Sequence, residues 1–228
     1  MGRTRAAPAA PGSAEDARRV PQRGAARAAL HAIGPHVARS GAMATELTRA
    51  LEDRLAQLLE SVIGWLQFAE SKNTGIVGLI STALGVIVSF LLAGPAVPTL
   101  AGVGLAVGAG MLMIALLLAV ASFLPATGLE RYLVGAHEPP GSEVNLLFYG
   151  HLARYDPHTL VRAVASHYGE VPADEVVVSK FASDLAGQIV TNARITVRKL
   201  RLYRAALLLF ASGVLSAAAA MALAALLE

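Results

Sequence analysis

The residues of this chain that could do chemistry form no catalytic or metal-binding set. There is no cysteine, which excludes disulfides, thiolate metal sites and thiol nucleophiles. None of the six histidines has a second histidine four residues away on an expected helix, the spacing that brings two imidazoles together on one face. No glycine-rich phosphate loop lies between an expected strand and a helix. We therefore expect no enzyme, no metal site and no cofactor.

A row of polar side chains near residue 190 is the first candidate for ligand binding. Asp184, Gln188 and Asn192 are four residues apart, and Lys199 lies two helical turns further along. A cluster of basic residues over 194–204 overlaps this row. Such side chains could hold an anionic ligand against a partner helix. A solvated helix face and a membrane anchor would give the same pattern.

A second polar group lies directly before a long apolar stretch. Glu70 and Lys72 could form a polar pocket at the membrane surface. Alternatively, Lys72 is an anchor, with its aliphatic stem along apolar surface and its ammonium group in water. Both readings require a membrane-spanning segment to begin close to residue 73.

Two apolar stretches without charge must position these polar groups. No Asp, Glu, Lys or Arg occurs in residues 73–129 or 205–227, and only 15% of all residues are charged. A bilayer core needs about 20 apolar residues per helix. The first stretch is broken at 94–98 by two prolines. It therefore predicts a hairpin of spans over about 75–93 and 99–124, and the second stretch predicts a third span.

Residues 43–72 are expected to form an amphipathic helix that leads into the first span. Thr45 is the expected N-cap, and Glu46 lies in the first turn, where the helix dipole favours an acid. Apolar side chains then recur every three or four residues, a heptad pattern that predicts packing on another helix. The positions of this heptad pattern are Leu51, Leu55, Leu58, Val62, Trp65 and Ala69.

Residues 1–42 are rich in Ala, Arg, Pro and Gly without apolar periodicity, so we expect a disordered tail. Because Met43 opens the amphipathic helix, an alternative is that the chain starts there and that the tail is a misassigned reading frame. The tail holds seven arginines and two acidic residues, which leaves 12 basic and 14 acidic residues elsewhere. This balance does not favour nucleic-acid binding.

Residues 126–204 are expected to form a small helical region that continues into the last span over 205–227. Asp156 followed by Pro157 predicts a helix start, and no proline interrupts residues 173–227. Nine basic residues lie in 130–204 and none in the 94–98 turn. The positive-inside rule therefore predicts that both the amphipathic helix and residues 126–204 are cytoplasmic, with the C-terminus outside. The fold class expected is an all-α integral membrane protein with three transmembrane helices.

Three short blocks, in their order along the chain, resemble the transmembrane effector family of the Pycsar bacterial anti-phage system. The first is WLQFAESK at 65–72, which runs into the first span. The second is LLFYGHLA at 146–153, followed by Asp-Pro. The third is DLAGQI at 184–189, which continues into the last span. The resemblance covers about residues 47–227. Glu70 stands where the family more often has Asp, and Asn73 where a small residue is usual.

The resemblance implies a function that composition does not show. A partner cyclase would make a cyclic pyrimidine nucleotide, cyclic UMP or cyclic CMP, on infection. The cytoplasmic region would sense it, and the protein would form homo-oligomers and damage the bacterial inner membrane, so that growth stops before phage spreads. An anionic cyclic nucleotide requires a cationic donor and an aromatic or amide face. The ligand-binding residues implied are Tyr149, His151, Arg154, Gln188, Asn192 and Lys199.

Two other functions remain open at this point. One is a related two-span effector of another defence system with a different trigger. The other is a membrane scaffold without a ligand, organised by the heptad pattern. Because the spans hold no charged residue, they offer no evident ion pathway. This favours membrane disruption by clustering over a selective channel.

Overall fold

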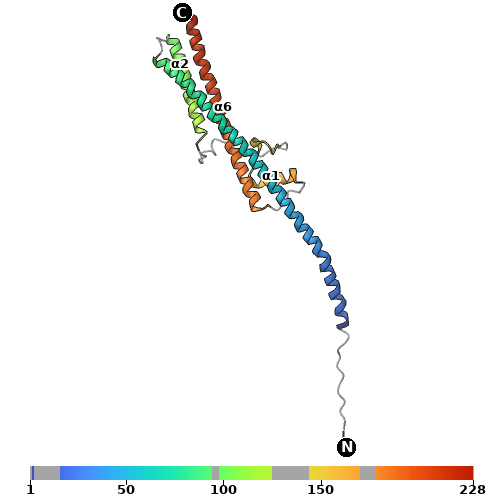
Figure 1. Ribbon diagram of the computed structural model, residues 1–228. Helices are drawn as coiled ribbons and strands as arrows, with labels where there is room; N and C mark the ends of the chain where they lie inside the picture. The colour runs from blue at the N-terminus through green and yellow to red at the C-terminus, as the bar shows by residue number, and fades with distance from the viewer. Residues whose placement is uncertain (1, 3–15, 94–97, 125–143, 170–177, 228) are drawn as a thin grey trace. The chain divides into compact units, whose positions relative to one another are not determined.

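The computed structural model describes residues 2, 16–93, 98–124, 144–169 and 178–227 (Figure 1). These residues form helices and turns and, within those ranges, no strand. Contacts divide the chain into residues 1–49 and residues 50–228. All packing described below lies within the second part.

Helix α1 spans Asp16–Ala93 as one continuous helix. It includes the expected amphipathic helix and the expected first span, but it begins well before Met43. Residues 16–42 are therefore helical where a disordered tail was expected, whereas residues 3–15 lie outside the described residues. Alanine and arginine are common in this segment and have high helix propensities. The segment also extends an existing helix, so no new nucleation is needed.

The first core joins α1 to three other helices: α4 (Tyr149–Leu152), α5 (Pro157–Tyr168) and α6 (Lys180–Leu227). Four of the six heptad positions on α1 are buried in it, and Ala69 is buried further along α1, which confirms that this face packs on other helices. The exception is Trp65, which is 39% exposed. From α6 the core receives mainly small side chains, so α1 and α6 approach closely. The α6 contributors are Ala182, Ala186, Ile189, Val190 and Ala193.

Helices α1 and α6 run parallel and in constant register. The Ser179 hydroxyl donates to the Glu52 carboxylate over 2.6 Å, a pair 127 residues apart in sequence. About five turns further on, Lys199 Nζ lies 2.8 Å from Glu70 Oε1, and these residues are 129 apart. Each residue of α6 therefore lies level with the α1 residue about 128 positions earlier.

The second core lies between the apolar ends of α1 and α6 and helix α2 (Thr99–Ala121). Helices α2 and α6 approach closely at Gly104 and Gly108, where the missing side chains let the two backbones come near each other. A Cβ added to Gly108 would lie 2.7 Å from the Gly213 carbonyl oxygen. Helix α2 ends at Ala121, three residues before the expected end of the span, and Ser122 follows as its C-cap.

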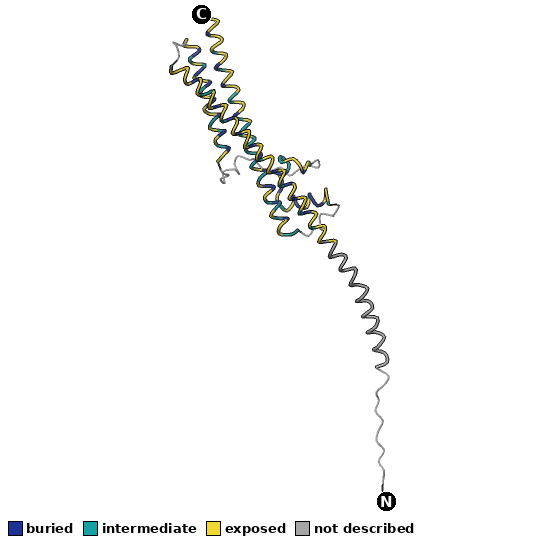
Figure 2. Tube along the Cα trace, in the orientation of Figure 1, coloured by how far each residue is buried: buried dark blue, intermediate teal, exposed yellow. Residues whose placement is uncertain are grey.

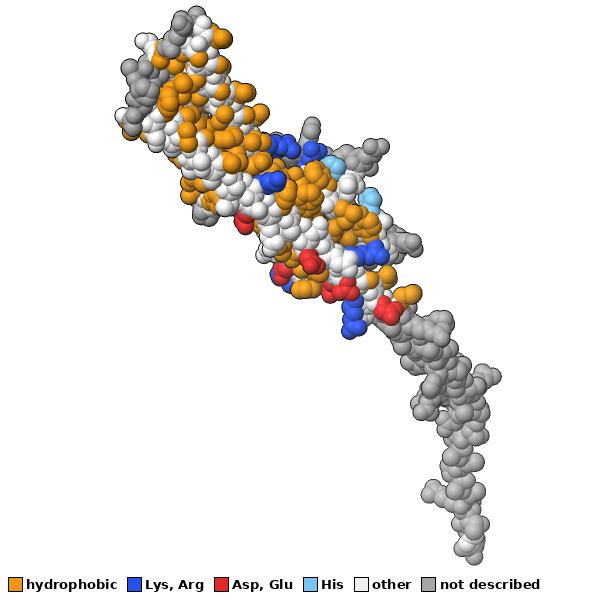
Figure 3. All heavy atoms as spheres, turned by 45° about the horizontal axis from the view of Figure 1, so that its top comes forward, with side chains coloured by type: hydrophobic (Ala, Val, Ile, Leu, Met, Phe, Trp, Pro, Cys, Tyr) orange, Lys and Arg blue, Asp and Glu red, His pale blue; other side chains and the backbone are white. Residues whose placement is uncertain are grey.

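Three helices, α1, α2 and α6, are long and apolar enough to cross a membrane. Their outward faces carry exposed apolar side chains, which would be unfavourable in water but suit lipid. Figure 2 shows these exposed outer faces, and Figure 3 shows apolar side chains over the spans with charged side chains gathered beyond them. Examples of exposed side chains are Val86, Leu92, Leu117, Leu208 and Leu215. This confirms the expected all-α fold with three membrane-spanning helices.

Candidate functional site

A pocket of about 400 Å³ lies beside the first core. One wall is a single face of α1, which presents residues at positions i, i+3, i+4 and i+7. The opposite wall comes from Tyr168, at the end of α5, and from Leu147, just before α4. The α1 residues that line the pocket are Arg54, Gln57, Leu58 and Ser61.

The polar groups of this pocket are available for a ligand. Within the described part of the chain, the Arg54 guanidinium makes no ion pair or hydrogen bond, and neither does the Tyr168 hydroxyl. Leu58 belongs to the first core and Leu147 is exposed, so both offer apolar surface. The pocket can therefore receive a small molecule with a flat ring and a negative charge.

An aromatic cluster lies on the next turns of α1, towards the membrane. The Trp65 ring lies 5.2 Å from the Tyr149 ring and 6.0 Å from the Phe68 ring, measured between centroids. Phe148 continues the cluster, 4.6 Å from Tyr149. Lys72 Nζ lies 5.2 Å from the Phe68 ring centroid, a cation–π contact. Trp65 therefore leaves the heptad core to stack on the segment that precedes α5.

The turn that carries Tyr149 is held in place by local hydrogen bonds. The Asn145 backbone N–H donates to His151 Nδ1 over 3.0 Å, and the Asn145 side chain accepts from Leu147 N–H over 2.9 Å. Arg194 of α6 donates to the carbonyl oxygens of Ala153 and Tyr155, over 3.1 and 2.9 Å. Arg194 thus satisfies carbonyls at the end of a short helix.

Helix α5 begins as the Asp-Pro pair predicted. The Asp156 carboxylate accepts hydrogen bonds from the backbone N–H groups of His158 and Thr159, over 3.0 and 3.1 Å, and from the Thr159 hydroxyl. The Thr159 hydroxyl is the main reason that the pKa of Asp156 lies below its usual range, and the two N–H groups add to it. Burial raises the pKa of the neighbouring Tyr155 phenol.

The six residues predicted to bind a ligand fall at different levels of the molecule. Tyr149 is stacked in the aromatic cluster, and His151 is occupied by its hydrogen bond from Asn145. The Arg154 side chain is exposed. On α6, the Gln188 side chain is exposed. The Asn192 backbone oxygen accepts a hydrogen bond from the Thr196 hydroxyl over 2.8 Å. Their role in binding remains a prediction.

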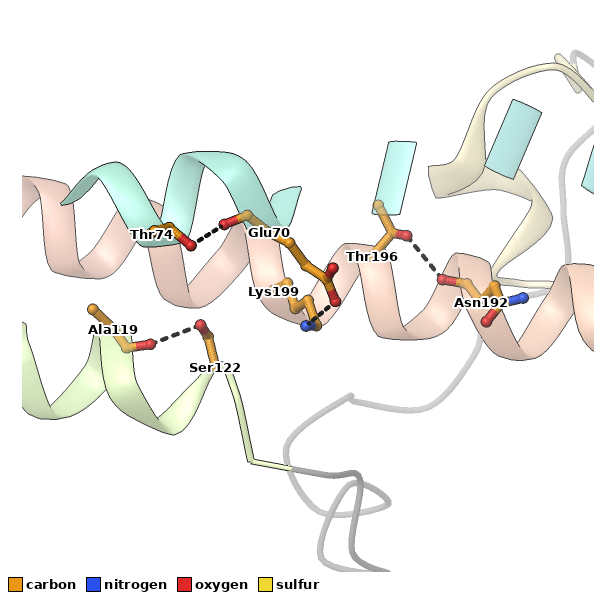
Figure 4. Close-up of polar contacts among 7 residues, drawn as sticks. All are labelled: Glu70, Thr74, Ala119, Ser122, Asn192, Thr196 and Lys199. Carbon is orange, nitrogen blue, oxygen red and sulfur yellow. Dashed lines mark hydrogen bonds and ion pairs between the residues drawn. The ribbon is translucent and has the colours of Figure 1, made fainter. Parts of the chain in front are cut away.

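Lys199 and Glu70 pair at the place where the three long helices meet (Figure 4). Lys199 Nζ also lies 5.8 Å from the ring centroid of Phe123, just beyond the end of α2. At the same level, two short side chains form hydrogen bonds to carbonyl groups of their own segments. The Ser122 hydroxyl donates to the Ala119 carbonyl over 2.7 Å, and the Thr74 hydroxyl donates to the Glu70 carbonyl over 3.1 Å. Lys199 of α6 therefore contacts α1 through Glu70 and the end of α2 through Phe123, at the boundary of the apolar part.

Asn73 lies one turn beyond Glu70 on α1 and is completely buried. Within the described part of the chain, neither polar atom of its side-chain amide has a hydrogen-bond partner. A buried, unpaired amide costs about 1–3 kcal/mol. Asn73 therefore weakens the packing of the helices at the boundary where Lys199 joins them.

Sequence reasoning missed the pocket residues, because Arg54 and Tyr168 are far apart in the chain and belong to no motif. The one indication in the sequence is that α1 has polar residues directly beside its heptad face. Among the described residues there is no group of three or more His, Asp or Glu side chains that could hold a metal ion.

Comparison with known protein families finds a match over most of the chain. The Pycsar effector protein domain, PycTM, matches residues 54–226. No curated protein and no solved structure matches the chain. The match begins at Arg54, and it contains the residues of the pocket, the second core, and all buried residues of the first core except Leu51. This chain therefore belongs to the Pycsar effector protein domain family.

Proposed function

We propose that this protein is a membrane effector of bacterial anti-phage defence that responds to a cyclic pyrimidine nucleotide. Cyclic UMP or cyclic CMP, made by a partner cyclase on infection, binds to the region outside the membrane. The protein then assembles into homo-oligomers in the inner membrane and impairs its integrity. The infected cell stops growing before phage can spread.

The observation that carries this proposal is the continuity of α1 and α6 from the first core into the apolar part. The Glu52–Ser179 and Glu70–Lys199 pairs hold the two helices in one register from the first core to the boundary of the apolar part. A ligand that shifts either helix in the first core would shift its apolar end as well. Continuous helices transmit such motions with little loss, because their backbone bonds are internal.

The effect on the membrane would come from assembly. No charged side chain lies in residues 73–93, 99–121 or 205–227, so the spans offer no polar path for ions. Helices associate in lipid through close packing of small residues and through polar contacts. Repacking of the three spans would expose new faces to a second copy. The N-terminus and the ligand-binding region are cytoplasmic in this proposal, as the distribution of basic residues favours.

Membrane potential in living bacteria tests this function. The protein is expressed together with an active pyrimidine nucleotide cyclase or with a catalytically dead variant of the same cyclase. A potential-sensitive dye should report loss of potential only with the active cyclase. Equal potential in both strains, at equal protein levels, would contradict the proposal. Loss of potential in both would identify a membrane-active protein without nucleotide control.

A further inference from the structure

We propose that the pocket beside α1 is the ligand site of this protein, and that it takes a single cyclic mononucleotide. The site is formed by Arg54, Gln57 and Ser61 of α1, with Tyr168 of α5 on the other side. This inference rests on the proposed function, which supplies the class of ligand. It replaces the six residues that the resemblance implied with a set that lies around one cavity.

Charge is the first argument for this pocket. Among the described residues that line it, Arg54 is the one cation and none is acidic. Its guanidinium has no partner in the described part of the chain. A guanidinium offers paired N–H donors that match two phosphate oxygens. The cyclic phosphodiester of a mononucleotide carries one negative charge, so one free arginine balances it.

The other lining residues suit a heterocyclic base. Tyr168 is 39% exposed and offers a ring on which a base can stack. Leu58 and Leu147 provide apolar surface for the face of the ring or the sugar. Gln57 has both an amide donor and a carbonyl acceptor, and Ser61 has a hydroxyl that serves as either. These groups match the alternating donors and acceptors on the edge of a pyrimidine.

Size favours a mononucleotide over a dinucleotide. Sites for small molecules occupy about 300–1,000 Å³, so a pocket of about 400 Å³ lies near the lower limit. A cyclic dinucleotide has two bases and two phosphates, and it would need a second cation and about twice the space. The pocket therefore selects against the dinucleotide.

The position of the pocket explains how occupancy would reach the membrane. Arg54, Gln57 and Ser61 lie on the helix that continues, without a break, to Ala93. A ligand held between them and Tyr168 would draw α5 towards α1. Tyr149, beyond Leu147, stacks on Trp65, one turn after Ser61. Binding should therefore change the surroundings of Trp65, the single tryptophan of the chain.

The test is a binding titration of the full chain in lipid nanodiscs with cyclic UMP and cyclic CMP, followed by calorimetry and by Trp65 fluorescence. We expect Arg54→Ala to raise Kd about tenfold or more. Tyr168→Ala should also weaken binding, and Tyr168→Phe should retain most of it because the ring remains. Cyclic dinucleotides should not compete. Arg162→Ala is the matched control, since Arg162 is exposed on α5 and does not line the pocket; it should bind like wild type.

The outcomes separate this inference from the proposed function. Wild type that binds no cyclic mononucleotide would overturn nucleotide sensing itself. If nucleotide binding survives Arg54→Ala and Tyr168→Ala but is lost with Arg154→Ala or Lys199→Ala, this pocket is not the ligand site. The proposed function would still hold in that case. Arg54 is exposed, so its variant should fold, and far-ultraviolet circular dichroism checks the helix content of each variant. Arg54→Lys retains the charge and should bind with intermediate affinity.

Discussion

Lys199 of α6 lies 2.8 Å from Glu70 of α1, at the level where the charged part of the molecule meets its apolar part. The Lys199 side chain is only 13% exposed, whereas Glu70 is 49% exposed. The pair fixes the register of two helices that both continue into the apolar region. Lys199 also reaches the ring of Phe123, so the contact connects all three long helices.

Reversing the charge at this pair should loosen the helix register. Lys199→Glu places two carboxylates together, and the double variant Glu70→Lys with Lys199→Glu restores the attraction. Because Glu70 is half exposed, we expect the single variant to lose about 1 kcal/mol or less of stability. Thermal unfolding in nanodiscs measures this, and the double variant should recover most of the loss.

A matched control for the charge reversal lies on the same helix. Lys180 and Asp184 also form an ion pair, but both side chains are largely exposed. Lys180→Glu should therefore leave the unfolding temperature close to wild type. If Lys199→Glu has no larger effect than Lys180→Glu, the boundary pair does not hold the register.

Gly108 should be essential for the packing of α2 on α6. Gly108→Val would drive a side chain into the Gly213 carbonyl, and overpacking of this kind typically costs about 1–3 kcal/mol. Gly110 lies on the same helix with open space around its Cβ position, so Gly110→Val should have little effect. Denaturation with SDS, followed by circular dichroism, compares the two. Equal stability would contradict the close backbone contact.

Asp156 should stabilise the first core through its cap on α5. Asp156→Ala should destabilise the protein by about 0.5–2 kcal/mol, while Asp156→Asn or Asp156→Ser should retain most of the cap. The pKa of Asp156 is lowered from its usual 3.8 in the folded protein. Its charged form therefore stabilises the fold above about pH 4, and this contribution is lost as the pH falls through the lower folded pKa.

Unfolding temperatures measured over a range of pH test this account of the cap. The difference between wild type and Asp156→Ala should be constant near neutral pH and should shrink on acidification below about pH 4. A difference that grows on acidification would show that the protonated acid is the better cap.

Asn73→Leu should strengthen the resting arrangement of the helices. It replaces a buried amide that has no partner among the described residues by an apolar side chain with the same branching and number of heavy atoms, which removes a cost of about 1–3 kcal/mol. We expect a higher unfolding temperature and, under the proposed function, a higher nucleotide concentration for half-maximal leakage. Reduced stability with unchanged nucleotide sensitivity would show that the amide is satisfied by water and plays no part in switching.

Regular patterns in the sequence predicted most of the fold. Heptad positions such as Leu55 and Val62 are buried as expected, because a repeated apolar face has few ways to avoid water. The absence of charge predicted the three spans. The helical character of residues 16–42 was not predicted, since their apolar side chains show no period and helix propensity alone is a weak guide.

Individual contacts were harder to predict than helices. Trp65 fits the heptad by spacing, yet it stacks on Tyr149, which lies 84 positions later and was not paired with it. Arg194 belongs to the basic cluster over 194–204, for which the sequence left a membrane anchor and an anionic-ligand site as alternatives; in the structure it donates to carbonyls at the end of α4. The pocket depends on Arg54 and Tyr168 meeting through the packing of α5 beside α1. No local signal predicts such contacts between distant segments.

Leakage from liposomes shows whether a cyclic nucleotide alone makes the protein disrupt a membrane. Purified protein is reconstituted into vesicles filled with a self-quenched dye, and cyclic UMP or cyclic CMP is added outside. Roughly half of the inserted molecules expose the ligand-binding region in random reconstitution, so external nucleotide reaches part of the protein. We expect dye release that requires nucleotide and that is much reduced in Arg54→Ala. Nucleotide binding without any release, or equal release without nucleotide, would contradict it.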